Sequence, residues 1–362
     1  MAKILLSTGG TGGHMSPASA LAKELQKRGN EIELATDNRG RKYINMFPDD
    51  MPVHIIKSGT SGAGIMGKIK GGVNLSQGIV MQGFSLIGKV KPDMVVGFGG
   101  YPSVPAVFAA QMRRIPTGLH EQNAILGKAN KFLSSKAHFI ALSLPSQEEV
   151  KGVIKYKMEV TGNPVRSKII ALKDANYPEF TNDSDFNIFV MGGSLGATVF
   201  SEVVPKAISS LPDKLKKRIK IVQQCREADI EQARSVYDKA DIDANLAPFF
   251  DDVAGHIAHS HLFIGRSGAS TVAEMSIAGL PAIYVPYPHH KDQQQLKNAI
   301  GVADKDGAWI IPQDEFTPAL LGKRIEGFFE NPKILPETSM RAKECGLPDA
   351  VQRLADLALR NI

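Results

Sequence analysis

The chain contains little cysteine and no long apolar run. Its 362 residues include only two cysteines, Cys225 and Cys345, which lie far apart. Neither has the spacing of a metal site, so we expect both to be reduced thiols of a cytosolic protein. No apolar stretch reaches the roughly 18–20 residues that span a bilayer, and the N-terminal run MAKILLSTGG lacks the pattern of a signal peptide. A membrane contact, if there is one, is therefore expected at the surface of the bilayer.

The composition is ordinary for a globular protein, but the charge is unevenly distributed. Hydrophobic residues make up 43% and charged residues 22% of the chain, and its length suits two domains. Residues 1–163 carry 20 basic and 11 acidic side chains, whereas the rest carries 23 and 26. The basic first half indicates an anionic partner, for which nucleic acid, an anionic membrane and a pyrophosphate substrate all fit. A basic surface without a partner explains the charge equally well.

A strand, a glycine loop and a helix follow one another twice. Lys3–Ser7 leads into GGTGGH and a helix over about 17–28, and Phe186–Met191 leads into GGSLGA and a helix to about Ser210. Further expected strands are Glu31–Ala35, Asp93–Gly97, Pro116–Leu119, His138–Ala141, Ile219–Gln223, His261–Ile264 and Pro281–Val285. Further expected helices are 102–112, 228–239, 270–278, 292–302 and one or two within 337–362. This rhythm predicts an α/β protein with two Rossmann-like, doubly wound parallel sheets, joined near TGNPVR at 161–166. Ligands bind at the carboxyl ends of such strands, so we expect the two domains to face each other across a cleft with both glycine loops at its mouth.

Residues 58–90 depart from this rhythm. Many glycines are interspersed with apolar residues, and Lys68 and Lys70 lie beside Ile69. One interpretation is a segment that presents apolar and basic groups to a bilayer. The alternative is a plain connection followed by a core helix over 75–90.

Two groups of polar residues in the first half are candidates for chemistry. The glycines of GGTGGH allow backbone N–H groups to approach a ligand, and the helix that follows favours an anion. His14, at the end of this loop, can accept a proton near neutral pH, although a capping or solvated histidine is as plausible from this motif alone. HEQN, at 120–123, follows a short strand and has the polarity of a site, or of side chains that satisfy loop backbone.

The segment from Phe263 to Ala299 is the densest in candidate residues. The loop RSGA, at 266–269, opens a helix whose N-terminus favours an anion. Glu274 can bind both hydroxyls of a ribose, or merely complement the helix dipole. The amides of the QQQ run suit sugar hydroxyls. His289 and His290 are adjacent without a carboxylate at a suitable spacing, which is poor support for a metal site.

Seven motifs together resemble a known family. GGTGGH, GFGGYPSVP, HEQN, TGNPVR, GGSLGA, RSGASTVAE and HKDQQQLKNA occur in this order over about residues 1–335. They resemble the MurG family, the UDP-N-acetylglucosamine–lipid I N-acetylglucosaminyltransferases of bacterial peptidoglycan synthesis. The resemblance implies a glycosyltransferase B-type fold, with an acceptor- and membrane-facing domain at 1–163, a UDP-sugar domain at 164–335 and closing helices at 336–362. It also implies inverting transfer without a metal or cofactor.

The same motifs imply which residues bind the donor, UDP-GlcNAc. Near its sugar and diphosphate would lie Thr11, Gly12, Gly13, Asn123, Arg166 and Ser194. Phe250 would flank uracil through its backbone, while Ala269, Ser270, Thr271, Val272, Ala273 and Glu274 would hold the diphosphate and ribose, with Glu274 on the diol. Gln294 and Gln295 would bind sugar hydroxyls.

The implied acceptor is undecaprenyl-pyrophosphoryl-MurNAc-pentapeptide, lipid I, attacked through its MurNAc 4-hydroxyl. Our choice for the base is His14, with Glu121 as the alternative, and Arg166 and helix N-termini would stabilise the departing UDP. The anionic inner leaflet of the bacterial plasma membrane and other cell-wall synthesis proteins are the implied partners, and nucleic acid is not one. Two rival functions are a nucleotide-sugar epimerase and a non-enzymatic nucleotide- or lipid-binding regulator.

Overall fold

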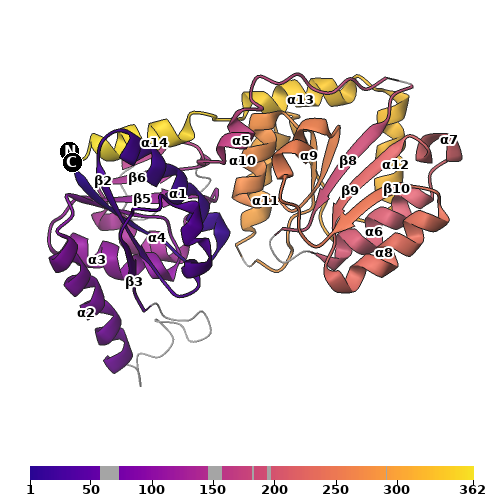
Figure 1. Cartoon of the computed structure of the whole chain (residues 1–362). Coiled ribbons are helices and arrows are strands. Elements are labelled where there is room, and N and C mark those ends of the chain that lie inside the picture. Colours follow the sequence, from indigo (N-terminus) through magenta and orange to yellow (C-terminus); the bar gives the residue numbers. More distant parts are fainter. Residues whose placement is uncertain (58–72, 146–156, 182, 194–196, 291) are drawn as a thin grey trace. The chain divides into compact units, whose positions relative to one another are not determined.

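The protein consists of two compact α/β units. The computed structural model describes residues 1–57, 73–145, 157–181, 183–193, 197–290 and 292–362 (Figure 1). Unit 1 comprises residues 1–166 and 348–362, and unit 2 comprises residues 167–347. The predicted closing segment, 336–362, is therefore divided between the two units. The predicted change of domain at 163/164 lies three residues before the change of unit at 166/167.

Unit 1 is built on a parallel sheet. In its described residues seven strands run in the order β3-β2-β1-β4-β5-β6-β7, and every neighbouring pair is parallel. The strands are β1 (Lys3–Ser7), β2 (Glu31–Thr36), β3 (Val53–Ile55), β4 (Met94–Gly97), β5 (Thr117–Glu121), β6 (Phe139–Leu142) and β7 (Met158–Val160). The strand order reverses direction between β1 and β4, which is where such sheets bind ligands.

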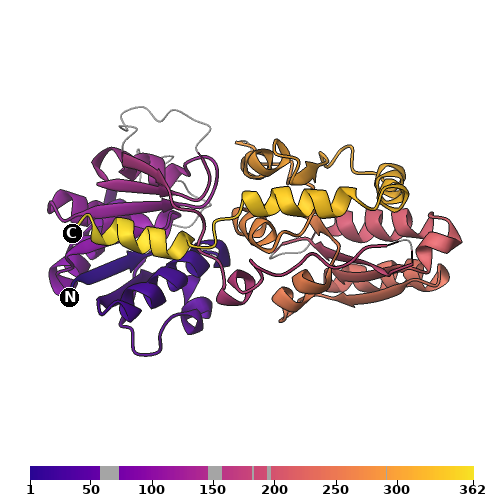
Figure 2. The same cartoon turned by 90° about the horizontal axis from the view of Figure 1, so that it is seen from above.

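Helices cover both faces of this sheet, because alternate residues of its strands are apolar on opposite sides. Ile4 and Leu6 belong to the core on the face of α1 and α14, whereas Leu5 belongs to the core on the face of α2 and α3. The helices are α1 (Gly12–Lys27), η1 (Gly40–Met46), α2 (Val73–Val90), η2 (Tyr101–Ser103), α3 (Val104–Met112), α4 (Lys128–Leu133), η3 (Ser134–Lys136) and α14 (Ala350–Leu359). Helix α14 packs on α1, so both termini lie close together in unit 1 (Figures 1 and 2).

Unit 2 repeats the plan. Its described residues form a six-stranded parallel sheet in the order β10-β9-β8-β11-β12-β13, which reverses between β8 and β11. The strands are β8 (Phe186–Met191), β9 (Ile219–Gln224), β10 (Asp243–Ala247), β11 (Leu262–Gly265), β12 (Ala282–Tyr284) and β13 (Ala308–Ile310). The predicted fold class, two Rossmann-like parallel-sheet domains, is confirmed.

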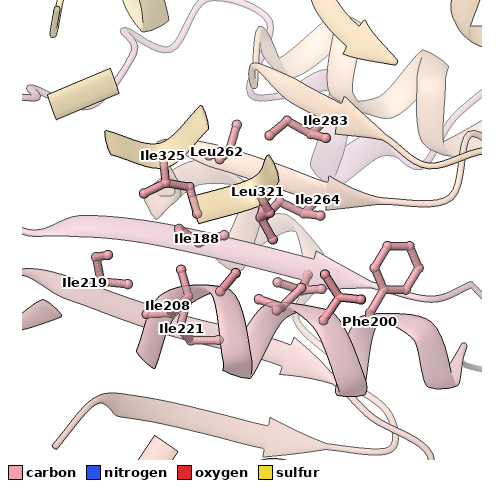
Figure 3. Close-up of a cluster of buried hydrophobic side chains, with 14 of the residues drawn as sticks. Ile188, Phe200, Ile208, Ile219, Ile221, Leu262, Ile264, Ile283, Leu321 and Ile325 are labelled. Carbon is pink, nitrogen blue, oxygen red and sulfur yellow. The ribbon is translucent and has the colours of Figure 1, made fainter. Parts of the chain in front are cut away.

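Helices α6, α8 and α12 cover one face of the second sheet, and α9, α10 and α11 cover the other (Figure 1). Figure 3 shows the buried core on the first face, where Phe200 and Ile208 of α6 meet strand residues such as Ile188. The helices are α5 (Ser167–Ile170), α6 (Thr198–Ser209), α7 (Asp213–Lys216), α8 (Glu227–Lys239), α9 (Val253–His259), α10 (Ala269–Ala278), α11 (Gln294–Ala303), α12 (Pro318–Glu330) and α13 (Ile334–Glu344).

One difference from the sequence-based elements is the start of α1. The prediction began this helix near Pro17, but it begins at Gly12. Glycine and proline are both unfavourable inside a helix, and Pro17 is the sixth residue of α1, where it has no N–H to donate to the carbonyl of Gly13. The local sequence therefore does not mark Gly12 as the start of this helix. His14 therefore lies in the first turn of α1 rather than in the loop before it.

Candidate active site

The first glycine loop lies at the point of unit 1 where the strand order reverses. It connects β1 to α1, and the loop after β4 lies beside it. Gly99 and Gly100 of that second loop have φ angles of +77° and +71°, which side chains rarely adopt. A Cβ atom at Gly99 would also come within 3.6 Å of His14 Nε2 and 3.3 Å of Asn130 Nδ2. Glycine at this position therefore keeps open the space in front of the His14 ring.

The side chain of Asp37 holds the first glycine loop in place through hydrogen bonds. This buried carboxylate follows β2 and accepts hydrogen bonds from the backbone N–H groups of Gly10 (3.2 Å) and Gly40 (3.0 Å) and from Arg39 Nε (2.8 Å). In dinucleotide-binding sheets the acid at this position binds a ribose. Here both of its oxygens hold the protein's own loops, so unit 1 does not offer the usual carboxylate to a nucleotide.

His14 has the properties of a neutral base. Its Nδ1 atom lies 3.0 Å from Thr11 Oγ1, so the Thr11 hydroxyl orients the ring. Burial lowers the pKa of the His14 imidazole below its usual value. The ring is therefore uncharged at neutral pH, with Nε2 on the side of Gly99. When Nδ1 carries the proton, Nε2 can accept one.

Glu121, the alternative base, is occupied by hydrogen bonds. It ends β5 and is only 3% exposed. One oxygen accepts from Asn123 N (3.0 Å) and Nδ2 (3.2 Å), and the other accepts from Gly127 N and Asn130 Nδ2, both at 2.8 Å. Burial raises the pKa of the Glu121 carboxyl, and these four hydrogen bonds oppose that shift. The geometry is that of a carboxylate that shapes the loop after β5.

His120 and Gln122 belong to the core of unit 1. The ring of His120 is fully buried beside Phe98, and its Nδ1 accepts a hydrogen bond from Gln122 Nε2 (2.9 Å). Nε2 then carries the proton and lies 3.4 Å from the carbonyl of Gly162. Burial lowers the pKa of His120 to about 4. Of the HEQN motif, Asn123 is therefore the residue that remains half-buried and reachable.

In unit 2 the reversal point is the N-terminus of α10. Gly268 caps this helix, and the side chains of Ala269 and Val272 are buried, so these two residues can meet a ligand only through their backbones. Val272 N–H already bonds to Gly268 O (2.9 Å), which leaves the N–H groups of the first three helical residues for an anion. Ser270, Thr271, Ala273 and Glu274 are half-buried, and Glu274 lies in the second turn.

The two glutamines begin α11, next to this helix. Gln295 Oε1 accepts a hydrogen bond from Tyr287 N (2.9 Å), and Gln294 Nε2 donates to Asp292 Oδ2 (2.7 Å). The Oε1 atom of Gln295 and the Nε2 atom of Gln294 thus already have hydrogen-bond partners in the loop before α11. His289 and His290 pack edge-on against the Tyr287 ring, with centroids 5.3 and 5.0 Å away. Within the described residues, no group of three or more His, Cys, Asp or Glu side chains is placed to hold a metal ion.

The remaining predicted residues are less well defined. The Phe250 ring packs against Phe189 and His256, with centroids 6.3 and 4.9 Å away, and the contact of its backbone with uracil stays a prediction. Ser194 lies outside the described residues. Arg166 is exposed at the end of unit 1, and its role at the diphosphate stays a prediction.

The structure brings together two groups of the predicted residues. Thr11, Gly12, Gly13 and His14 gather near Gly99 in unit 1, and Ala269–Glu274 lie beside Gln294 and Gln295 in unit 2. Sequence reasoning missed the residues that support them, namely Asp37, Asn130, Arg266 and Asn298. Asp37 had a usable signal, an acid directly after a strand. Asn130 had none, because nothing in its local sequence marks a buried contact.

Comparison with known proteins agrees with this architecture. The family model described as "Glycosyltransferase family 28 N-terminal domain" matches residues 4–142, and "Glycosyltransferase family 28 C-terminal domain" matches residues 187–354. A protein of Rhodospirillum centenum is 46% identical over 99% of this chain and 94% of its own length. One of Sphingopyxis alaskensis is 43% identical over 98% of this chain and 90% of its own length. Both are named UDP-N-acetylglucosamine–N-acetylmuramyl-(pentapeptide) pyrophosphoryl-undecaprenol N-acetylglucosamine transferase.

The chain belongs to this family of transferases. A crystal structure of Acinetobacter baumannii MurG matches it with a TM-score of 0.81 at 28% identity, over 99% of this chain and 100% of that one. The fold extends beyond the family. A UDP-GlcNAc 2-epimerase from Neisseria meningitidis matches with a TM-score of 0.70 over 99% of this chain and 100% of its own, but at 13% identity, which shows a shared fold alone. None of the helices in the described part of the chain is long and apolar enough to cross a membrane.

Proposed function

We propose that this protein transfers GlcNAc from UDP-GlcNAc to the 4-hydroxyl of MurNAc in undecaprenyl-pyrophosphoryl-MurNAc-pentapeptide, making lipid II for peptidoglycan synthesis. The observation that carries the proposal is the likeness, over nearly the whole chain, to relatives that bear this activity in their name. The reaction inverts the anomeric carbon and needs no metal, since helix N-termini offer N–H groups to the charge that develops on the leaving diphosphate.

Unit 2 holds the donor in this proposal. The free N–H groups at the start of α10 bind the diphosphate, Glu274 binds the ribose diol, and Gln294 and Gln295 bind sugar hydroxyls. Their arrangement supports this, because α10 and α11 pack on each other and begin at the same edge of the sheet. The backbone at Phe250 flanks uracil.

His14 is the base in this proposal, and it removes the proton of the attacking hydroxyl. Its neutral ring, its Thr11 partner and the open space at Gly99 suit that role. The four hydrogen bonds to Glu121 count against the alternative, because a base needs a lone pair directed at the substrate. Glu121 instead orients Asn123 from within the loop.

Unit 1 meets the lipid acceptor and the anionic inner leaflet of the plasma membrane in this proposal. An amphipathic patch on α2, α3 and α4 supports it. Met81, Met112 and Phe132 are 66%, 49% and 60% exposed, and Phe108 stacks on Phe132 at 6.1 Å. Two basic side chains lie on the same helices or beside them: Arg113 lies over the Phe84 ring and Lys136 contacts the Met112 sulfur. Exposed apolar groups accompanied by cations are typical of a surface that rests on anionic lipid.

The test is transfer of radiolabelled GlcNAc from UDP-GlcNAc to a short-chain lipid I analogue in the presence of EDTA. We expect label in the lipid product, which would establish donor, acceptor and metal independence together. Absence of transfer by protein that still binds UDP-GlcNAc would overturn the acceptor assignment. Release of a free epimerised UDP-sugar would favour the epimerase instead.

A further inference from the structure

Arg266 is a buried cation that the proposed reaction does not use. It directly follows β11, and the residue is only 9% exposed. Its Nη1 donates to the carbonyls of Val285 (2.9 Å) and Pro286 (3.1 Å), and its Nη2 donates to Gln313 Oε1 (2.5 Å). These acceptors belong to the loop after β12 and the loop after β13. One guanidinium thus joins the ends of three neighbouring strands.

Aromatic rings complete the surroundings of this guanidinium. Its carbon lies 5.3 Å from the centre of the Phe200 ring, near the start of α6, and 5.5 Å from that of Tyr287. Burial lowers the pKa of Arg266, and its hydrogen-bond acceptors among the described residues are all neutral. Burying a cation without an anionic partner is costly, and an apolar side chain of similar size would fill the space more cheaply. Such a residue indicates a requirement of function rather than of stability.

Ser267, the residue after Arg266, links the end of β11 to α11. Ser267 Oγ donates to the backbone carbonyl of Gln295 (2.8 Å), and Ser267 O accepts from Asn298 Nδ2 (3.2 Å). Tyr287, which stacks on Arg266, donates its N–H to Gln295 Oε1. Arg266 and Ser267 therefore set the position of the first turn of α11 against the start of α10.

We propose that Arg266 is a positioning residue that holds the sugar-binding amides of Gln294 and Gln295 in register with the diphosphate-binding end of α10. This inference rests on the proposed donor site. Arg266 accordingly governs how tightly the sugar part of the donor is held, while the UDP part is held by α10 itself. The guanidinium suits the task because its planar fork fixes several donor directions at once, which a lysine ammonium cannot do.

The test compares Arg266→Lys with Arg324→Lys, a matched change on α12 of the same unit, where an exposed arginine lies 6.0 Å from the Trp309 ring. Calorimetric titration gives the Kd for UDP-GlcNAc and for UDP. We expect Arg266→Lys to weaken UDP-GlcNAc binding about tenfold, since charge-assisted hydrogen bonds are lost, and to leave UDP binding within about twofold of wild type. Arg324→Lys should change neither.

Two outcomes overturn the inference: wild-type binding of both ligands by Arg266→Lys, or an equal loss for both. The first would show that charge alone suffices, and the second that Arg266 only supports the fold. Gln313→Ala removes one acceptor and leaves the arginine in place, so it provides a second test if Arg266→Lys does not fold. We expect Gln313→Ala to weaken binding of UDP-GlcNAc, by less than Arg266→Lys does, and to leave UDP binding unchanged. If Gln313→Ala binds UDP-GlcNAc as tightly as wild type does, the inference is overturned. The proposed function is judged separately, by transfer to lipid I in the wild-type protein.

Discussion

At the scale of single residues, the side chains of His14 and Glu121 differ in their capacity to accept a proton from the substrate. We expect His14→Ala to lower kcat by roughly a hundredfold or more, because general-base catalysis contributes about that much. The Kd for UDP-GlcNAc and the thermal midpoint should stay near wild type, since the half-buried ring has a single side-chain hydrogen-bond partner among the described residues, Thr11. Steady-state kinetics, donor titration and calorimetry check the three quantities. A loss of donor affinity in proportion to the loss of kcat would make His14 a binding residue.

Glu121→Gln is the comparison for that experiment. An amide places an NH₂ group where a carboxylate oxygen accepts two hydrogen bonds, so it confronts either Asn123 or the pair Gly127 and Asn130 with a second donor. We expect the thermal midpoint to fall together with kcat. A Glu121→Gln variant with the thermal midpoint of wild type and a large loss of kcat would instead favour Glu121 as the base.

His120 should make folding stability depend on pH. Its pKa is lowered from 6.5 to about 4 by burial, so between these values the unfolded chain binds a proton that the folded chain does not. The stability due to this residue is therefore complete above pH 6.5 and is lost as pH falls towards 4. At pH 5 the loss is on the order of 2 kcal/mol. Urea unfolding at pH 7.5 and 5 should show a smaller pH effect in His120→Gln than in wild type; an equal effect would contradict the assignment.

The sequence indicates candidate site residues more readily than the residues that support them. His14 and Glu274 follow glycine-rich turns, so the local pattern alone makes them candidates. The contacts of Arg266 could not be predicted in this way, because only the fold brings Val285, Pro286 and Gln313 to it. The two readings of HEQN were also inseparable in sequence, and burial separates them: His120 is core, whereas Asn123 remains reachable.

At the scale of helices and strands, central strands were predictable, whereas edge strands and several helices, among them α9 and α12, were not. β1 and β8 have the predicted bounds, because a strand buried on both faces is a continuous apolar run. The edge strands β3, β7, β10 and β13 were missed. Asp243–Ala247 is one example: DANLA is short, contains Asp and Asn and has no β-branched or aromatic residue, and its pairing with β9 along one side makes it a strand.

Helix α2 offers a test of packing at this scale. A Cβ atom on Gly83 would lie 2.2 Å from the backbone oxygen of Pro105, where α2 meets α3. We expect Gly83→Ala to destabilise the protein by about 1–3 kcal/mol, because backbone must move. At Gly88, in the same helix, the nearest atom is the flexible end of Arg113 at 3.2 Å, so Gly88→Ala should be neutral or slightly stabilising. Equal stabilities in urea unfolding would show that α2 does not pack on α3 at Gly83.

At the scale of the whole molecule, charge and exposed apolar surface coincide in one unit. By its sequence, unit 1 has 23 basic and 13 acidic residues, a net charge of +10, whereas unit 2 has 20 and 24, a net charge of −4. The amphipathic patch lies on the basic unit. The predicted membrane segment, 58–90, overlaps it only in α2; Lys68 and Lys70 lie outside the described residues, and Met112 and Phe132 were not foreseen.

Because the amphipathic patch lies on the basic unit, we expect the protein to bind anionic vesicles, and we expect this binding to require both the positive charge of unit 1 and the apolar side chains of the patch. Phe132→Ser should weaken cosedimentation with phosphatidylglycerol vesicles about tenfold or more, since burying a phenylalanine contributes roughly 1.5–3 kcal/mol. Phe249→Ser is the control, because Phe249 is 70% exposed but lies on the acidic unit 2; it should bind as wild type does. Wild-type binding should also weaken as salt rises, because screening reduces the attraction between unit 1 and the lipid. Equal losses for the two serine variants would mean that exposed apolar area alone, rather than its place on the basic unit, brings this protein to the membrane.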